Sequence, residues 1–167
     1  MKLLHIPQFR AFVFTSILGT FLHFLYDLSG QNPLIALISA INESTWEHMK
    51  LLFVPMLLST VFQRKYYQDR PDYLCIQLKS ILLGLILIPA LFYTYNGAFG
   101  KSPDFINIGI YFVSAATAYY CAYKQFAASC QKCNRASALL LLCLLFLAFS
   151  LFTFFAPSIP LFASPVM

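Results

Sequence analysis

Ionisable side chains gather in two short stretches of the chain, each at the edge of a strongly apolar segment. The first stretch is His23-Phe24-Leu25-Tyr26-Asp27, and the second runs from residue 42 to residue 50. Charged groups in or beside hydrocarbon are costly, so they are rarely found there without a partner and a role. We therefore expect a functional site where the two stretches meet. Its candidate residues are His23, Asp27, Glu43, Glu47, His48 and Lys50.

In the first stretch, His23 and Asp27 are four residues apart, so on a helix the carboxylate can accept the imidazole N–H. That bond would fix the tautomer and leave the second ring nitrogen for a proton, a metal or a substrate. Both residues fall on an arc of small and polar positions that begins at Ser16 and includes Gly19 and Thr20. Such an arc on an otherwise oily helix is expected to face other helices.

The second stretch contains Ser44-Thr45-Trp46-Glu47, which matches the capping box that begins a helix. Lys50 follows Glu47 at i+3, within reach of an ion pair. Glu43 is one turn before Glu47, which predicts a face of two carboxylates and a lysine, while His48 lies on a separate edge. Glu47 as a cap and Lys50 as a side chain that extends to the lipid headgroups are the structural alternatives.

Three kinds of chemistry suit this set of residues. Carboxylates and imidazoles bind divalent metals such as Zn, Mn or Fe, with His23, Asp27, Glu43, Glu47 and His48 as the candidate ligands. A bound metal can activate water near the lipid headgroups, although the spacing matches no fixed metal motif. The same residues suit a proton relay coupled to transport, or the binding of a lipid headgroup or a partner helix.

The composition is that of a membrane protein. The chain has 167 residues, of which 60% are hydrophobic and 10% charged, whereas soluble proteins carry about 25% charged residues. The net charge is +5, but the basic residues are too dispersed for a surface that follows a nucleic acid backbone. This excludes nucleic acid as a partner and makes the lipid bilayer the expected environment.

Five apolar stretches are long enough to cross a bilayer as helices, which takes about 20 residues. The sequence predicts an all-α integral membrane bundle in a single domain, residues 1–167. Residues 33–41 are too short to span, and Asn32-Pro33 fits the start of a short interfacial or re-entrant helix. The predicted spans lie near residues 9–29, 44–62, 74–95, 105–126 and 137–156.

The distribution of Lys and Arg orients this bundle. Nine of the eleven basic residues fall before the first span or around the second and fourth connections, beginning with Lys2 and ending with Arg135. By the positive-inside rule, that side is cytoplasmic. The N-terminus is then expected inside and the C-terminus outside, with the first segment a retained span rather than a cleaved signal peptide.

The cysteines give a weaker signal. Cys130 and Cys133 form a CxxC on the predicted cytoplasmic side, where half of a zinc site or a redox pair competes with plain reduced thiols. Because a second CxxC is missing and the cytoplasm is reducing, we expect reduced loop thiols. Cys75, Cys121 and Cys143 are expected to be small packing residues.

The segments HFLYDLSGQNP and NESTWEHMKLLFVP, between His23 and Pro55, resemble a family of small bacterial multi-pass membrane proteins that is catalogued as a domain of unknown function. The resemblance implies a multi-pass protein of the bacterial cytoplasmic membrane, and it implies no activity.

The leading hypothesis is therefore a site open to the outer leaflet that uses a divalent metal to hydrolyse a lipid or lipid-linked substrate. A small proton- or ion-coupled transporter, an accessory subunit and a non-catalytic scaffold are the alternatives. The expected partners are the bilayer and a lipid or small-molecule ligand, with a protein partner or a second copy also open.

Overall fold

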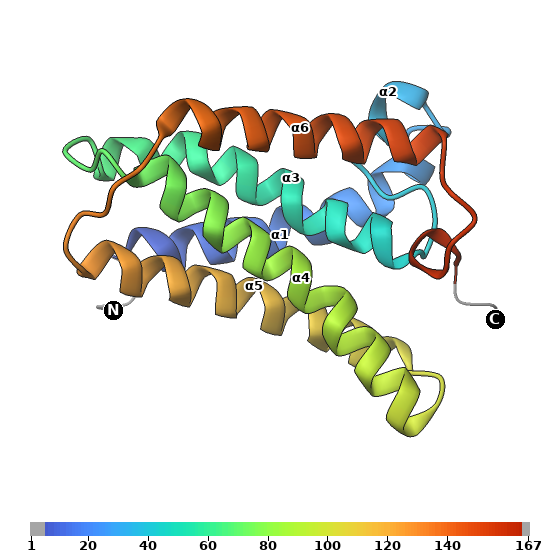
Figure 1. Cartoon of the computed structure of the whole chain (residues 1–167). Coiled ribbons are helices and arrows are strands. Elements are labelled where there is room, and N and C mark those ends of the chain that lie inside the picture. The colour runs from blue at the N-terminus through green and yellow to red at the C-terminus, as the bar shows by residue number, and fades with distance from the viewer. Residues whose placement is uncertain (1–5, 165–167) are drawn as a thin grey trace.

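The chain folds as a bundle of five long helices, as the apolar stretches predict. The computed structural model describes residues 6–164, and in Figure 1 the long helices run side by side along most of their length. A short helix, α2, and two 3-10 turns, η2 and η3, complete the elements. In chain order they are α1 (Pro7–Leu28), α2 (Pro33–Ala36), α3 (Thr45–Gln63), η2 (Arg64–Tyr66), α4 (Tyr73–Phe99), α5 (Asp104–Ala127), α6 (Arg135–Phe154) and η3 (Pro160–Phe162).

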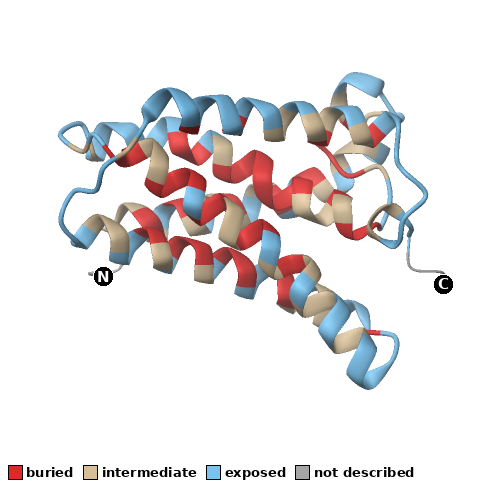
Figure 2. Ribbon diagram, viewed as in Figure 1, coloured by how far each residue is buried: buried red, intermediate tan, exposed pale blue. Residues whose placement is uncertain are grey.

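Four of these helices, α1, α4, α5 and α6, are long and apolar enough to cross a membrane. The fifth, α3, has 19 residues but begins with a polar turn that contains Glu47, His48 and Lys50. It is instead the most enclosed helix, and Figure 2 shows burial concentrated along it. It packs against α1, α4, α5 and α6, so its polar groups are surrounded by protein.

A buried seam of hydroxyl groups joins three of the helices at mid-length. The Tyr119 hydroxyl on α5 lies 2.6 Å from Thr15 Oγ1 on α1 and 2.8 Å from Ser59 Oγ on α3. Tyr111 on α5 donates to the Thr15 carbonyl at 3.1 Å. Between helices in lipid the hydrophobic effect supplies little, so interhelical hydrogen bonds and close packing hold such contacts.

The segment between α1 and α3 doubles back along α1. α1 ends at Leu28, and Gly30 takes a left-handed conformation (φ 69°) that turns the chain. Asn32 then caps α2, accepting a hydrogen bond from the Leu34 N–H at 2.9 Å, as the sequence predicts. The helix stops at Ala36, earlier than the predicted 41, and the Ser39 side chain that follows bonds to the backbone of α1.

One end of each of the five long helices lies at what we call the basic end, on the left of Figure 1. Tyr67, after η2, donates to Gln8 of α1 at 2.7 Å, and Arg135 of α6 donates to the Pro71 carbonyl at 3.0 Å. Among the described residues it includes most of the basic side chains that orient the bundle, whereas Lys2 lies outside the described residues. The basic end comprises Arg10, Arg64, Lys65, Arg70, Lys124, Lys132 and Arg135.

The expectation for the cysteines was wrong at two positions. Cys75 of α4 and Cys133 of the α5–α6 connection form a disulfide, whereas Cys121, Cys130 and Cys143 are free thiols. The pairing is not evident from the sequence because 58 residues separate the two cysteines. A disulfide is typical of an oxidising compartment, whereas the positive-inside rule predicts that this end faces the cytoplasm.

Candidate metal centre

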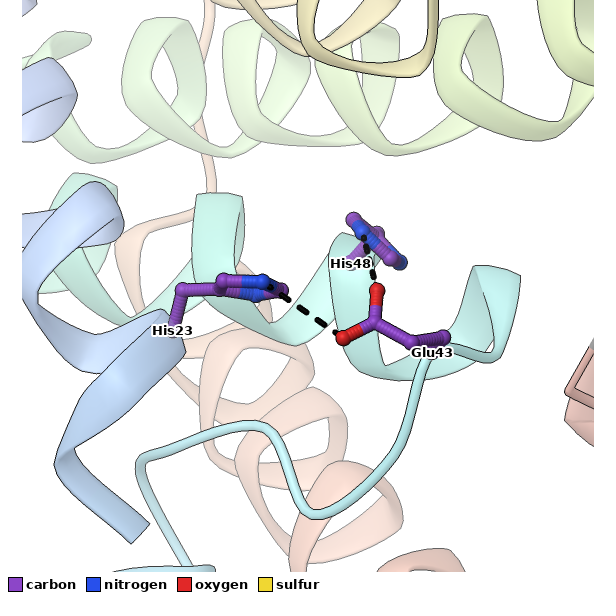
Figure 3. A group of neighbouring side chains, drawn as sticks. All are labelled: His23, Glu43 and His48. Atoms are coloured by element: carbon purple, nitrogen blue, oxygen red, sulfur yellow. Dashed lines mark ion pairs between the residues drawn. The ribbon is translucent and has the colours of Figure 1, made fainter. Parts of the chain in front are cut away.

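Two elements and the connection between them bring three candidate residues together at the end of the bundle opposite the basic end. His23 lies near the end of α1, His48 lies one turn into α3, and Glu43 lies just before α3. Figure 3 shows the Glu43 carboxylate between the two imidazoles. His23 Nε2 is 3.5 Å from one carboxylate oxygen, and His48 Nε2 is 3.5 Å from the other.

Local hydrogen bonds explain why Glu43 can reach both rings. The side chain of Ser39 accepts from the Tyr26 N–H and donates to the Leu22 carbonyl, which holds the returning chain against α1. The Asn42 side chain then accepts from the Ser44 N–H at 2.9 Å, a turn that Asn commonly makes. Ser44 is the N-cap of α3, so Glu43 lies outside the helix.

The orientation of His48 leaves one nitrogen for a ligand. Its Nδ1 is 3.0 Å from the Ser44 carbonyl oxygen, which can only accept, so Nδ1 carries the proton. Nε2 is therefore the ring nitrogen that faces Glu43, 3.5 Å from its carboxylate. A backbone carbonyl behind a histidine ring is the usual outer-shell partner of a metal-binding imidazole, because it fixes the ring and makes the free nitrogen more basic.

The spacing of the three residues suits a small divalent cation. One ligand atom from each of His23, Glu43 and His48 can be chosen so that all lie within 4.8 Å of one another. Two ligands of a tetrahedral zinc, each about 2.1 Å from the metal, stand about 3.4 Å apart, close to the two 3.5 Å separations found here. Two histidines and one glutamate leave a fourth position for water, as in catalytic zinc sites.

The site is open to its surroundings. The side chain of Glu43 is 63% exposed, and those of His23 and His48 are 28% and 25% exposed. The His23 ring lies edge to face with the ring of the adjacent Phe24, at 4.9 Å between centroids. The cluster is therefore accessible from outside the bundle.

The other predicted site residues are not part of this cluster. Asp27 is exposed and has no side-chain partner among the described residues, so His23 pairs with Glu43 and not with Asp27 as the helical spacing suggests. A spacing of four residues permits that bond but does not require it. The sequence predicts that Glu43 lies on the same helix face as Glu47. That prediction did not include the turn at Asn42, which directs Glu43 toward α1.

Glu47 and Lys50 form a separate, buried ion pair. Lys50 Nζ is 2.6 Å from Glu47 Oε2, which confirms the predicted pairing at i+3, and both side chains are at most 2% exposed. Ser44 accepts from the Glu47 N–H as in a capping box, but the Glu47 carboxylate does not complete that box. It accepts instead from the Ile41 N–H at 3.1 Å, so that it anchors the connection before α3.

Thr153 of α6 is a partner of the ion pair that the sequence analysis missed. Lys50 donates to its hydroxyl at 2.7 Å, and that hydroxyl lies 3.2 Å from Glu47 Oε1. Lys50 also donates to the Ala36 carbonyl at 2.8 Å. A hydroxyl in the last turn of an otherwise apolar helix was the only available signal, and it does not identify a partner more than 100 residues away.

The comparisons with known proteins place the chain in a family without assigning it an activity. No curated protein and no solved structure matches the chain. A family model described as "Family of unknown function (DUF6512)" matches residues 4–167, nearly the whole chain. The chain therefore belongs to this family of unknown function, in agreement with the resemblance of its N-terminal third.

Proposed function

We propose that this protein binds a divalent metal ion, zinc by preference, through His23, Glu43 and His48, and uses it to hydrolyse a lipid or lipid-linked substrate at the membrane surface. The observation that carries the proposal is the group of three ligand atoms, one from each side chain, that all lie within 4.8 Å of one another. Imidazole nitrogens favour zinc over magnesium or calcium.

The chemistry follows from the open position. A zinc ion with three protein ligands lowers the pKa of its bound water to about 7, which supplies hydroxide at neutral pH. The cluster lies at the end of α1, which is long and apolar enough to cross a membrane. A substrate that approaches from the headgroup region would therefore meet the metal without leaving the membrane, and an ester or phosphoester near that surface is the substrate class that fits.

The test is an assay of purified protein, loaded with zinc, on mixed micelles of phospholipids and lipid-linked phosphates, with the products identified by mass spectrometry. Release of a headgroup or acyl chain that stops on chelation and returns with zinc would support hydrolysis. The variants His48→Ala and Glu43→Gln should be inactive, whereas Asp27→Asn, an exposed carboxylate on the same helix as His23, should retain activity. Activity that survives loss of His48 would contradict the proposal.

A second candidate, proton- or ion-coupled transport, is favoured by a chain of hydrogen-bonded polar side chains inside the bundle. Side-chain hydrogen bonds run from Tyr67 through Gln8 and Gln63 to Ser59 and on to the Tyr119 hydroxyl. Proteoliposomes that carry a pH-sensitive dye would show proton flux if this chain conducts. Flux abolished by Tyr119→Phe, together with no hydrolysis, would favour transport over the leading proposal.

A further inference from the structure

A groove between α1 and the end of α3 combines a basic rim with an apolar floor, and it lies at the basic end, away from the metal centre. Its volume is about 360 Å³. Arg10, Lys65 and Tyr66 lie at the end where the helices stop, and Ala11, Phe14 and Phe62 line it further along. No carboxylate lines this groove among the described residues.

The rim has the donors that a phosphate diester needs. Arg10 donates to the Tyr66 hydroxyl at 3.2 Å across the mouth of the groove, and Lys65 Nζ lies 5.2 Å from the centre of the Tyr66 ring. A guanidinium group has five N–H donors in a planar fork that matches phosphate oxygens, and the lysine adds a point charge. Arg10 and Lys65 give the rim two positive charges, which favour an anion as the ligand.

The floor has the character that an acyl chain needs. Phe14 and Phe62 meet edge to face at 5.8 Å between centroids, and Phe62 is 60% exposed. α1 is long and apolar enough to cross a membrane, so the groove runs from the helix ends along a surface that would face lipid. Basic residues at the end of a membrane helix attract anionic headgroups, because the surrounding lipid surface adds to the local charge.

We propose that this groove binds an anionic phospholipid, with its phosphate against Arg10, Lys65 and Tyr66 and the start of an acyl chain along Ala11, Phe14 and Phe62. The charge of the rim favours an anionic over a zwitterionic headgroup. The apolar floor favours the intact lipid over a soluble phosphate. The proposal is independent of the metal centre, which lies at the other end of the bundle.

The experiment measures the thermal unfolding of delipidated protein in a non-ionic detergent, with phosphatidylglycerol or phosphatidylcholine added to the micelles. At a lipid concentration about 100-fold above Kd, a specific ligand should raise Tm on the order of 5 °C. We expect this rise with phosphatidylglycerol only, and a smaller rise at 1 M NaCl, where the Debye length is about 3 Å. Glycerol phosphate alone should give no rise.

Matched variants distinguish lipid binding in the groove from a nonspecific effect of positive charge at the basic end. Lys65→Gln should reduce the rise, and Arg10→Gln with Lys65→Gln should abolish it, whereas Lys132→Gln should leave it unchanged because that exposed lysine lies on another connection at the same end. Circular dichroism and gel filtration establish that each variant is folded. Equal protection by phosphatidylcholine, an equal loss in Lys132→Gln, or full protection by glycerol phosphate would overturn the proposal.

Discussion

At the scale of single residues, the position of Glu43 determines what the candidate site can do. Glu43 lies on the connection between α1 and α3 and contacts both imidazoles, at 3.5 Å each. The sequence predicts that acidic and imidazole groups gather here, and it names all three residues. It does not predict which carboxylate bridges the rings, because this depends on a turn at Asn42 that helical periodicity does not describe.

Asp72, at the start of α4, is the residue with the best-defined protonation behaviour outside the membrane-spanning segments. It is 1% exposed and accepts two hydrogen bonds from the Arg70 guanidinium, at 2.9 Å each, and one from the Gln131 N–H at 3.0 Å. The hydrogen bonds from Arg70 lower the pKa of Asp72 well below its usual range, and the Gln131 N–H lowers it further. Asp72 therefore fastens the α5–α6 connection to α4 as a carboxylate.

We predict that Asp72→Asn lowers the free energy of unfolding by about 1–3 kcal/mol, since it leaves Arg70 without its charged partner. Because folding lowers this pKa, the stabilisation is complete above the unfolded-state pKa of about 3.9 and is lost as the pH falls through the folded-state value. Unfolding in detergent at pH 7 and at acidic pH measures both effects. An equal difference between wild type and variant at the two pH values would contradict this role.

At the scale of elements, α3 organises the bundle. Its first turn holds the buried pair Glu47–Lys50, which joins the connection after α2 to the last turn of α6 through Thr153. Burying two charges is costly, and removing only one of them leaves the other unpaired, which costs about 3–5 kcal/mol. Thr153 is the α6 group that bonds to both charges, so a different packing of α6 on α3 would leave the buried pair without this hydroxyl.

We predict that Lys50→Met and Glu47→Gln each destabilise the protein by about 3–5 kcal/mol, and that the double variant is less destabilised than the sum of the two. A double-mutant cycle on unfolding in detergent measures the coupling. Retention of zinc binding by the folded double variant would show that Glu47 is structural and not a ligand. Additive effects of the two substitutions would contradict the buried pair.

Gly19 sets the distance between α1 and its neighbours. A Cβ added there would overlap the Tyr111 hydroxyl and lie 3.0 Å from the Leu51 carbonyl oxygen, so alanine fits only if the buried Tyr111 side chain moves. Gly19 is thus buried as the small and polar arc predicts, because small residues permit close approach of helices, but Thr20 and Asp27 of the same arc are exposed.

We predict that Gly19→Ala lowers the free energy of unfolding by about 1–3 kcal/mol through overpacking. Gly97→Ala is the matched control, since a Cβ at Gly97 in α4 meets nothing within 4 Å. Alanine is the better helix former by about 1 kcal/mol, so the control should be neutral or stabilising. Equal destabilisation at both positions would contradict the close contact at Gly19.

At the scale of the whole molecule, the helices could be predicted from the sequence, but the disulfide and the side-chain contacts that join them could not. Long apolar runs predict α4, α5 and α6 because they must be helical to satisfy their backbone in lipid. The polar start of α3 predicts its cap, but not that α3 becomes the enclosed helix, since that depends on how its neighbours pack. The disulfide and the contact of Thr153 with Lys50 depend on tertiary arrangement alone.

The disulfide Cys75–Cys133 ties the α5–α6 connection to α4 across 58 residues. We predict that Cys75→Ser lowers the free energy of unfolding of the oxidised protein by about 2–4 kcal/mol, and that Cys130→Ser does not. Alkylation of unreduced, denatured protein should label three of the five cysteines. Five labelled cysteines in protein purified without reductant would contradict the disulfide.

Alkylation in intact cells would show whether this end of the bundle faces a reducing compartment, as the charge distribution predicts.

The most direct test of the metal centre is a competition titration of purified protein with zinc and a chromogenic chelator, combined with X-ray absorption at the zinc edge. We predict one zinc per chain, with two imidazole nitrogens and at least one oxygen as ligands at about 2.0–2.2 Å. His23→Ala, His48→Ala and Glu43→Gln should each weaken binding at least about tenfold, and Asp27→Asn should bind as wild type. Zinc that fails to bind, or that binds equally well without Glu43 and His48, would contradict this prediction.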